Sequence, residues 1–350
     1  MMEDIRVFVS YSHEERDKVS QLCDVLRENG LTPMTDQGFA FGTGFPEQIK
    51  AYIAHAHVFL PFVTKRSSER GWVHQEIGYA SALNIPVMPV TVEADPPGII
   101  AMVHGAQLKE NLEDAAKKLT RDRFEWLVCV AARSDRPPLY ECAADNRMRA
   151  RMFADYADGI RGIGFTGCVR QKGALTSFHI PDTHVRGRAW ERRWDDGLRD
   201  RHYCQRLRNE RLALQAHADA EGCRLIINPK ALEDAQYSAD SRLGRVEQLL
   251  AFLQDSENEH TLVVPNREVH REESVTIVGD WFSARSVSIE PGRGYQQTMF
   301  TRHAPTVRQE MEEFDEQFAE LLQLNDMTEE NCRERVIAQL EEMAEGLAAE

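Results

Sequence analysis

The residue most able to do chemistry in this sequence is Glu76, within the segment 70–84. If the segment is a helix, with about 100° of rotation per residue, Glu76 and Tyr79 lie about 40° and 20° to either side of Trp72. A carboxylate in such an apolar sector costs roughly several kcal/mol unless it is paired or used. Two interpretations stay open: an ion pair with basic residues of 65–70, or a carboxylate at the mouth of a pocket with Trp72 as an aromatic wall.

Alternating strand and helix signals must position this carboxylate. Continuous apolar runs at 5–11, 32–35, 58–63 and 86–92 predict buried strands of a parallel α/β sheet, and 119–132 predicts a last helix or strand. Such sheets bind ligands at the carboxyl ends of their strands. Ser10, Tyr11, the segment 36–46 and the start of the helix 70–84 are therefore expected to converge.

The segment 36–46 combines three glycines with three phenylalanines, and Pro46 suits the first turn of a following helix. Exposed aromatic side chains on a loop usually pack against a ligand or another surface. The residues that give the loop this character are Phe39, Phe41, Gly42, Gly44 and Phe45.

Together these residues carry a family resemblance. The run 6–12 (Arg-Val-Phe-Val-Ser-Tyr-Ser), the loop with Gly44 ahead of a helix, and Trp72-x-x-x-Glu76 resemble a prokaryotic Toll/interleukin-1 receptor (TIR) domain over roughly Asp4 to Ala132. The resemblance implies a flavodoxin-like fold with a parallel five-stranded sheet. In many members it also implies cleavage of the nicotinamide–ribose bond of NAD.

On this resemblance, Glu76 matches the family's catalytic glutamate. A carboxylate can stabilise an oxocarbenium-like transition state, and nicotinamide leaves as an already cationic group, so no general acid is required. The expected substrate-binding residues are Trp72, Ser10, Tyr11, Phe39, Phe41 and Tyr79. NAD is then the substrate, and no cofactor or metal is expected.

The resemblance also implies an assembly-dependent enzyme. In the family, the loop matching 36–46 commonly packs on a neighbouring TIR domain, so Gly42, Gly44 and Phe45 are expected at an interface between copies of this chain. This loop lacks the basic residue that some catalytic members carry. Phosphate contact is therefore expected from elsewhere, with Lys50 and Arg6 as candidates.

The composition of the chain excludes some classes of function. The chain has 350 residues and a formal charge of −15, which argues against nucleic acid as the main partner. The segment Glu310–Glu350 holds 14 acidic and 2 basic residues, so most of the excess lies there. Seven cysteines without a C-x-x-C pair, and the absence of long apolar runs or an export signal, predict a cytoplasmic protein without a membrane span.

The sequence predicts four regions: a TIR domain at 1–133, a linker at 134–150, an α/β or α+β sensor or oligomerisation domain at 151–305, and an acidic helical hairpin at 306–350. Strand signals occur at 224–228, 261–264, 274–278 and 286–289. The arginine-dense stretch 186–211 is a candidate docking surface for the acidic end. A G-x-G-x-x-G match at 162–167 lacks the preceding strand and following helix of a dinucleotide site.

Around His270 the sequence faintly resembles the second half of a phospholipase D motif. Glu272 stands where that motif needs lysine, so the resemblance implies a degenerate, non-catalytic domain. The alternative is an unrelated domain in which Trp281 and Phe282 are core residues. His55, His57, His179 and His184 have no metal-ligand company in the sequence.

Taken together, the sequence predicts an NAD glycohydrolase that self-assembles, as an effector in immune or anti-phage signalling. An unknown ligand or protein at the C-terminal domain would activate it. The alternative is a non-enzymatic TIR scaffold that acts through TIR–TIR contacts.

Overall fold

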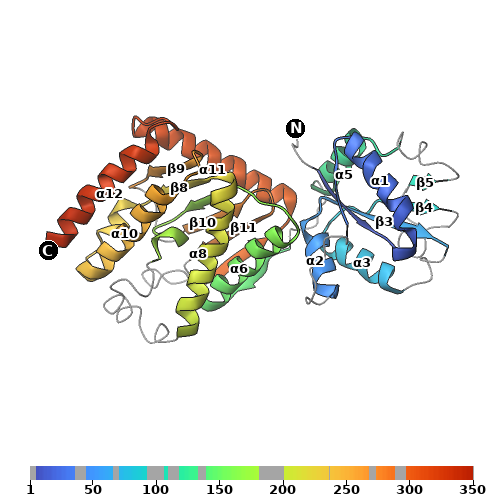
Figure 1. Ribbon diagram of the computed structural model, residues 1–350, viewed down its shortest axis with the longest axis horizontal. Coiled ribbons are helices and arrows are strands. Elements are labelled where there is room, and N and C mark those ends of the chain that lie inside the picture. The colour runs from blue at the N-terminus through green and yellow to red at the C-terminus, as the bar shows by residue number, and fades with distance from the viewer. Residues whose placement is uncertain are drawn as a thin grey trace. The chain divides into compact units, whose positions relative to one another are not determined.

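The computed structural model describes residues 5–35, 45–65, 71–92, 106–108, 118–132, 139–180, 201–235, 237–267, 273–287 and 297–349. The chain divides into two compact units (Figure 1). Unit 1 comprises Met1–Leu139 with Arg302–Pro305, and unit 2 comprises Tyr140–Thr301 with Thr306–Glu350. No helix in the described ranges is long and apolar enough to cross a membrane.

Unit 1 is built on a parallel sheet in the order β2-β1-β3-β4-β5, the order of flavodoxin-like sheets. Its strands are β1 (Arg6–Ser10), β2 (Thr32–Met34), β3 (Val58–Thr64), β4 (Val90–Val92) and β5 (Ala106–Leu108). Its helices are α1 (Arg16–Glu28), α2 (Phe45–His55), α3 (Gly71–Ala82) and α5 (Arg121–Ala132). The predicted parallel α/β architecture is confirmed, and 119–132 is a helix.

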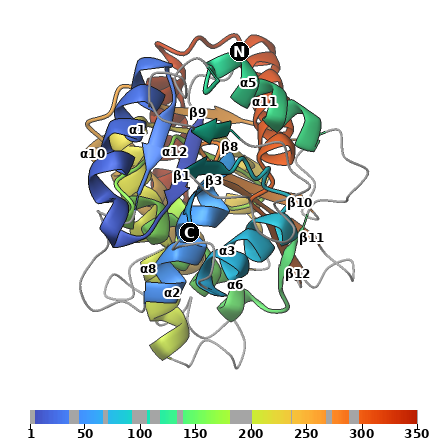
Figure 2. The ribbon, with the colours of Figure 1, turned by 90° about the vertical axis from the view of Figure 1, so that its right-hand side faces the viewer.

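The two faces of this sheet are covered by different helices (Figure 2). Ile5, just before β1, and the alternate side chains Val7 and Val9 of β1 pack in one core with α1 and α5. The intervening side chains face α2 and α3; the Phe8 ring, for example, lies 5.5 Å from that of Tyr52. Consecutive residues at the carboxyl end of β1 therefore point to opposite faces.

Unit 2 contains a mixed sheet in the order β6-β12-β11-β10-β7-β8-β9, in which β7, β8 and β9 are parallel. Its strands are β6 (Glu141–Ala143), β7 (Val169–Lys172), β8 (Cys223–Ile227), β9 (Thr261–Pro265), β10 (Glu273–Val278), β11 (Phe282–Val287) and β12 (Gln297–Thr301). Its helices are α6 (Asn146–Gly162), α8 (Arg201–Glu221), α9 (Pro229–Leu232), α10 (Ala239–Asp255), α11 (Ala304–Leu324) and α12 (Cys332–Ala349).

The predicted boundaries need two corrections. The expected linker 134–150 already contains β6 and the start of α6, because Asp145 caps that helix by accepting the Met148 N–H at 2.7 Å. The acidic end does form two helices, but α12 packs against α10 and β9, and both helices belong to unit 2. The C-terminal segment is thus part of the body of unit 2 and not a separate hairpin.

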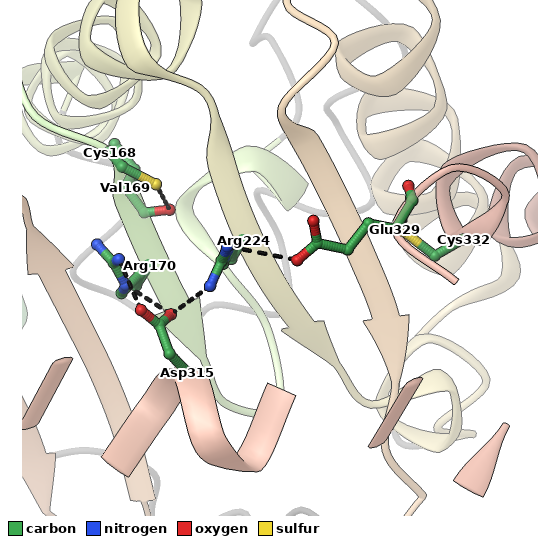
Figure 3. A network of polar contacts seen from close by, with 7 residues as sticks. All are labelled: Cys168, Val169, Arg170, Arg224, Asp315, Glu329 and Cys332. Carbon is green, nitrogen blue, oxygen red and sulfur yellow. Dashed lines mark hydrogen bonds and ion pairs between the residues drawn. The ribbon is translucent and has the colours of Figure 1, made fainter. Parts of the chain in front are cut away.

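The acidic helix α11 docks on arginines of the sheet in unit 2. Figure 3 shows Asp315 facing Arg170 of β7 and Arg224 of β8. Arg170 donates two hydrogen bonds of 2.8 Å to Asp315, and the Arg224 guanidinium lies 2.9 Å from the same carboxylate. Glu310 accepts from Ser283 and lies 3.4 Å from Arg285 of β11. Most of the stretch 186–211 lies outside the described residues, so its predicted role as a docking surface for the acidic end stays a prediction.

Candidate active site at the carboxyl end of β1

The candidate site forms where β1 ends against α3. Ser10 is the last residue of β1, and its Oγ–H donates to Glu76 Oε2 of α3 at 2.5 Å. The two side chains are 5% and 8% exposed, so the carboxylate is held below the surface of the domain. The sequence placed both residues near this edge, and the structure joins them by a short, charge-assisted hydrogen bond.

Local sequence explains how Glu76 is held there. In α3, Val73, Ile77 and Ala80 are buried, which fixes the helix against the sheet, and Glu76 lies on the same buried side. Tyr79 is half-buried one turn further along the helix. The helix begins at Gly71, so Glu76 lies in its first half, close to the carboxyl edge of the parallel sheet.

Tyr11 is placed differently from the prediction. Its side chain is 6% exposed and packs in the core with Val19 and Leu22 of α1, on the face of the sheet opposite to Glu76. This follows from the alternation of side chains at the end of β1. The position of Tyr11 makes it a packing residue of unit 1.

The other predicted site residues are only partly described. Trp72 is the second residue of α3, and Phe45 is the first residue of α2 instead of a loop residue, but neither side chain is described. Phe39, Phe41, Gly42 and Gly44 lie outside the described residues, as do Arg66 and Arg70. Their predicted roles stay predictions.

Arg6 lies far from the candidate site. It lies at the opposite end of β1 from Ser10, about 13 Å away at the usual rise of a strand. Its side chain is 3% exposed, and its Nε–H donates to the His55 carbonyl at 2.9 Å, while its backbone N–H donates to His57 Nδ1 at 3.0 Å. His55 and His57 are thus structural partners of a buried arginine. Lys50 is exposed on α2.

The glycine motif at 162–167 lies between the end of α6 and β7, so the structure gives it no dinucleotide-binding context. Gly167 packs against Gly279, where an added Cβ would lie 2.8 Å from the neighbouring Cα. The motif is explained by this close approach of two backbones. Among the residues that the structure describes, no group of three or more His, Cys, Asp or Glu side chains could hold a metal ion.

Comparison with known proteins finds a family model that matches part of unit 1. Residues 7–120 match the family model described as the TIR domain. Among solved structures, the chain is similar to one from "Structure of the activated Roq1 resistosome directly recognizing the pathogen effector XopQ (TIR domains)", with 21% identity, a TM-score of 0.24, and coverage of 37% of this chain and 85% of that one. The search of curated proteins found no match.

Proposed function

We propose that the TIR domain of residues 7–120 cleaves the nicotinamide–ribose bond of NAD, with Glu76 as the catalytic carboxylate. The observation that carries the proposal is the hydrogen bond from Ser10 to Glu76 at the carboxyl edge of the parallel sheet. A domain that only scaffolds has no evident use for a buried carboxylate at the edge where α/β sheets bind ligands.

The proposed reaction needs little from the protein beyond placement and charge. As the C1′–N bond breaks, nicotinamide departs with the bonding electron pair and becomes neutral, and positive charge develops on the ribose. A carboxylate at Glu76 stabilises that charge, in the way glycosidases stabilise oxocarbenium-like states. Water, or an internal nucleophile in a cyclising reaction, then attacks C1′, and attack by water releases a proton to solvent.

The hydrogen bond from Ser10 supports this role in two respects. It fixes the orientation of the carboxylate, because without it the side chain could adopt several rotamers. It also stabilises the ionised form of the carboxylate that the reaction requires. Orientation within about an ångström matters for reactions of this kind. Ser10 thereby becomes a positioning residue in the proposal.

We further propose that activity depends on TIR–TIR contacts between copies of this chain and that the protein acts as an effector in immune signalling. The basis is the family match alone. Unit 2 would carry the sensing or oligomerising role, and its likeness to a phospholipase D-like domain stays a prediction because His270 and Glu272 lie outside the described residues.

The test is nicotinamide release by the purified full-length protein, both free in solution and clustered on a surface through an affinity tag. We expect release in the clustered state and none from Glu76→Ala under the same conditions. A scaffold without enzymatic activity would leave NAD intact in both states. A protein in which Glu76→Ala retains full activity would show that another residue carries the chemistry.

A further inference from the structure

Two neighbouring strands of the sheet in unit 1 end at different levels along the strand direction. β1 and β3 are parallel, with Ser10 opposite Pro61, and β1 ends at Ser10. β3 continues for three more residues, to Thr64, so its carboxyl end lies about 10 Å beyond Ser10 at the usual rise of a strand. The hydrogen-bonded pair of Ser10 and Glu76 is thus set back from the end of β3. The protruding end of β3 lies in the direction in which ligands of such sheets are bound.

Lys65 is the first residue after β3, and its side chain is exposed. The side chains of β3 alternate between the two faces of the sheet. Phe62 packs in the core with α1 and α5, whereas the Phe59 ring lies 6.0 Å from the Phe8 ring on the face of α2 and α3. The odd-numbered residues of β3 are therefore on the same face as Glu76. Continued by one residue, this alternation places Lys65 on that face as well.

Two other cations, Arg6 and Lys50, are placed less well for a contact with the diphosphate of NAD. Arg6 is buried at the amino end of β1. Lys50 is exposed on α2, which packs on the sheet through buried residues that include Tyr52 and Ile53. At about 100° per residue, Lys50 lies roughly 110° from the middle of that buried sector, on the outer side of the helix. Of these three cations, Lys65 combines the carboxyl edge of the sheet with the face of Glu76.

We propose, building on the NAD cleavage proposed above, that Lys65 binds the diphosphate of NAD and makes this site selective for substrates that carry phosphate. With the nicotinamide ribose at Glu76, the diphosphate follows from the ribose C5′ atom, away from the nicotinamide. The Cα atom of Lys65 lies about 13 Å beyond Ser10 along the sheet, and the flexible four-carbon stem lets its ammonium group span part of that distance. An ammonium group donates charge-assisted hydrogen bonds to phosphate oxygens.

An ion pair between Lys65 and Glu76 would have different consequences. Such a pair would orient the carboxylate, so its loss would change kcat for every substrate that Glu76 acts on. A contact with the diphosphate instead changes KM, and it does so only for substrates that carry phosphate. Nicotinamide riboside has the scissile bond of NAD without any phosphate, so it separates the two roles.

The experiment measures nicotinamide release from NAD and from nicotinamide riboside by the full-length protein clustered on a surface. Lys65→Met should raise KM for NAD by at least about fivefold, with kcat and the kcat/KM for nicotinamide riboside each within about twofold of the wild type. Lys65→Arg keeps the charge and should recover most of the affinity for NAD. Lys118→Met is the matched control at the other edge of the sheet. This exposed lysine lies three residues before Arg121, whose guanidinium donates to the Gly30 carbonyl near the amino end of β2.

A second arm measures the binding of ADP-ribose to the same clustered proteins, because this molecule carries the diphosphate and has no nicotinamide to lose. We expect Lys65→Met to bind ADP-ribose at least about fivefold more weakly than the wild type, and Lys118→Met to bind it as the wild type does. The affinity should also fall more steeply with rising salt in the wild type than in Lys65→Met, because the contact joins two charges at an exposed position.

Equal KM values for NAD in the wild type and Lys65→Met would overturn the proposal. So would a loss of activity on nicotinamide riboside that matches the loss on NAD, equal binding of ADP-ribose by the two proteins, or no binding by the wild type. None of these results removes the proposed function while the wild type still releases nicotinamide. Conversely, a wild type that binds ADP-ribose more tightly than Lys65→Met but releases no nicotinamide would refute the cleavage and retain the phosphate contact.

Discussion

Two carboxylates in this chain, the buried Glu76 and the half-buried Asp315, have very different surroundings. In unit 1, Glu76 receives a hydrogen bond from the neutral hydroxyl of Ser10 at the carboxyl edge of a parallel sheet. In unit 2, Asp315 lies on the sheet face under α11 and meets the guanidinium groups of Arg170 and Arg224 (Figure 3). The comparison separates a carboxylate held by two fixed cations on a sheet face from one that accepts a hydrogen bond at the carboxyl edge of a parallel sheet.

The pKa of Asp315 reflects its surroundings. Burial by itself would raise it, but the hydrogen bonds from Arg170 and the charges of both arginines outweigh burial and lower the pKa. Such a carboxylate binds its helix to the sheet. The difference teaches that burial of an acid does not by itself indicate function; its partners and its place in the sheet do.

The largest effect is expected on the rate of NAD cleavage when the charge of Glu76 is removed. Glu76→Gln keeps the size of the side chain and removes its charge, so we expect nicotinamide release to fall by about 10²–10³-fold, the loss typical when an electrostatic stabiliser of a transition state is removed. Steady-state assays with NAD would measure it. Glu125→Gln on α5, an acid paired with Arg121, is the matched control and should change the rate by less than about twofold.

The next effect concerns stability. Asp315→Ala leaves Arg170 largely buried without its carboxylate, and we expect a loss of about 2–3 kcal/mol in the free energy of unfolding, measured by urea denaturation. Asp155→Ala removes an exposed pair with Arg151 and should cost less than about 0.5 kcal/mol. Equal effects of the two changes would refute the view that Asp315 secures α11.

A smaller effect is expected at Ser10. Ser10→Ala should lower kcat for NAD cleavage by about 10-fold with KM nearly unchanged, because the carboxylate loses its orientation but not its charge. Ser10→Thr retains a hydroxyl and should recover most of the rate. Thr91→Val removes a buried hydroxyl elsewhere in the same sheet and controls for loss of packing. A rise in KM with unchanged kcat would assign Ser10 to substrate binding instead.

The smallest effect is the pH dependence of stability contributed by His179, a buried histidine of unit 2. Its pKa is about 3 in the folded protein and about 6.5 when unfolded, so the unfolded chain binds the extra proton between these values. Stability should therefore decrease as the pH falls below 6.5, by about 1.4 kcal/mol per pH unit from this group. Denaturation at pH 7.5 and 5.5 should show a shallower decrease in His179→Gln. An unchanged slope in that variant would show that His179 does not stay neutral.

The sequence predicted the architecture of unit 1 well, because continuous apolar runs such as 58–63 read directly as buried parallel strands. It missed β5, whose three residues Ala106–Leu108 are too short to give a pattern. The sequence analysis placed both Ser10 and Tyr11 in the substrate site, although adjacent side chains of a strand point to opposite faces of the sheet. This alternation could have been applied to the sequence, and it would have assigned the two residues to different faces.

The same reasoning that singled out Glu76, a charged residue in the apolar sector of a helix, could have predicted that Arg245 is buried. On α10, Arg245 lies at an angle between Leu249 and Phe252, inside the apolar sector. The docking partners of the acidic end were beyond the sequence, because Arg170 and Arg224 are distant in the chain and become neighbours only through the register of β7 and β8. Patterns within one element are visible in a sequence, whereas registers between strands are not.

The most direct test of the central claim is a mass balance of NAD and its products with the clustered full-length protein. The account predicts one nicotinamide released for each NAD consumed, together with linear or cyclic ADP-ribose, and consumption by Glu76→Gln that is lower by at least about 10²-fold. Intact NAD under clustering conditions, or loss of NAD without nicotinamide, would contradict it.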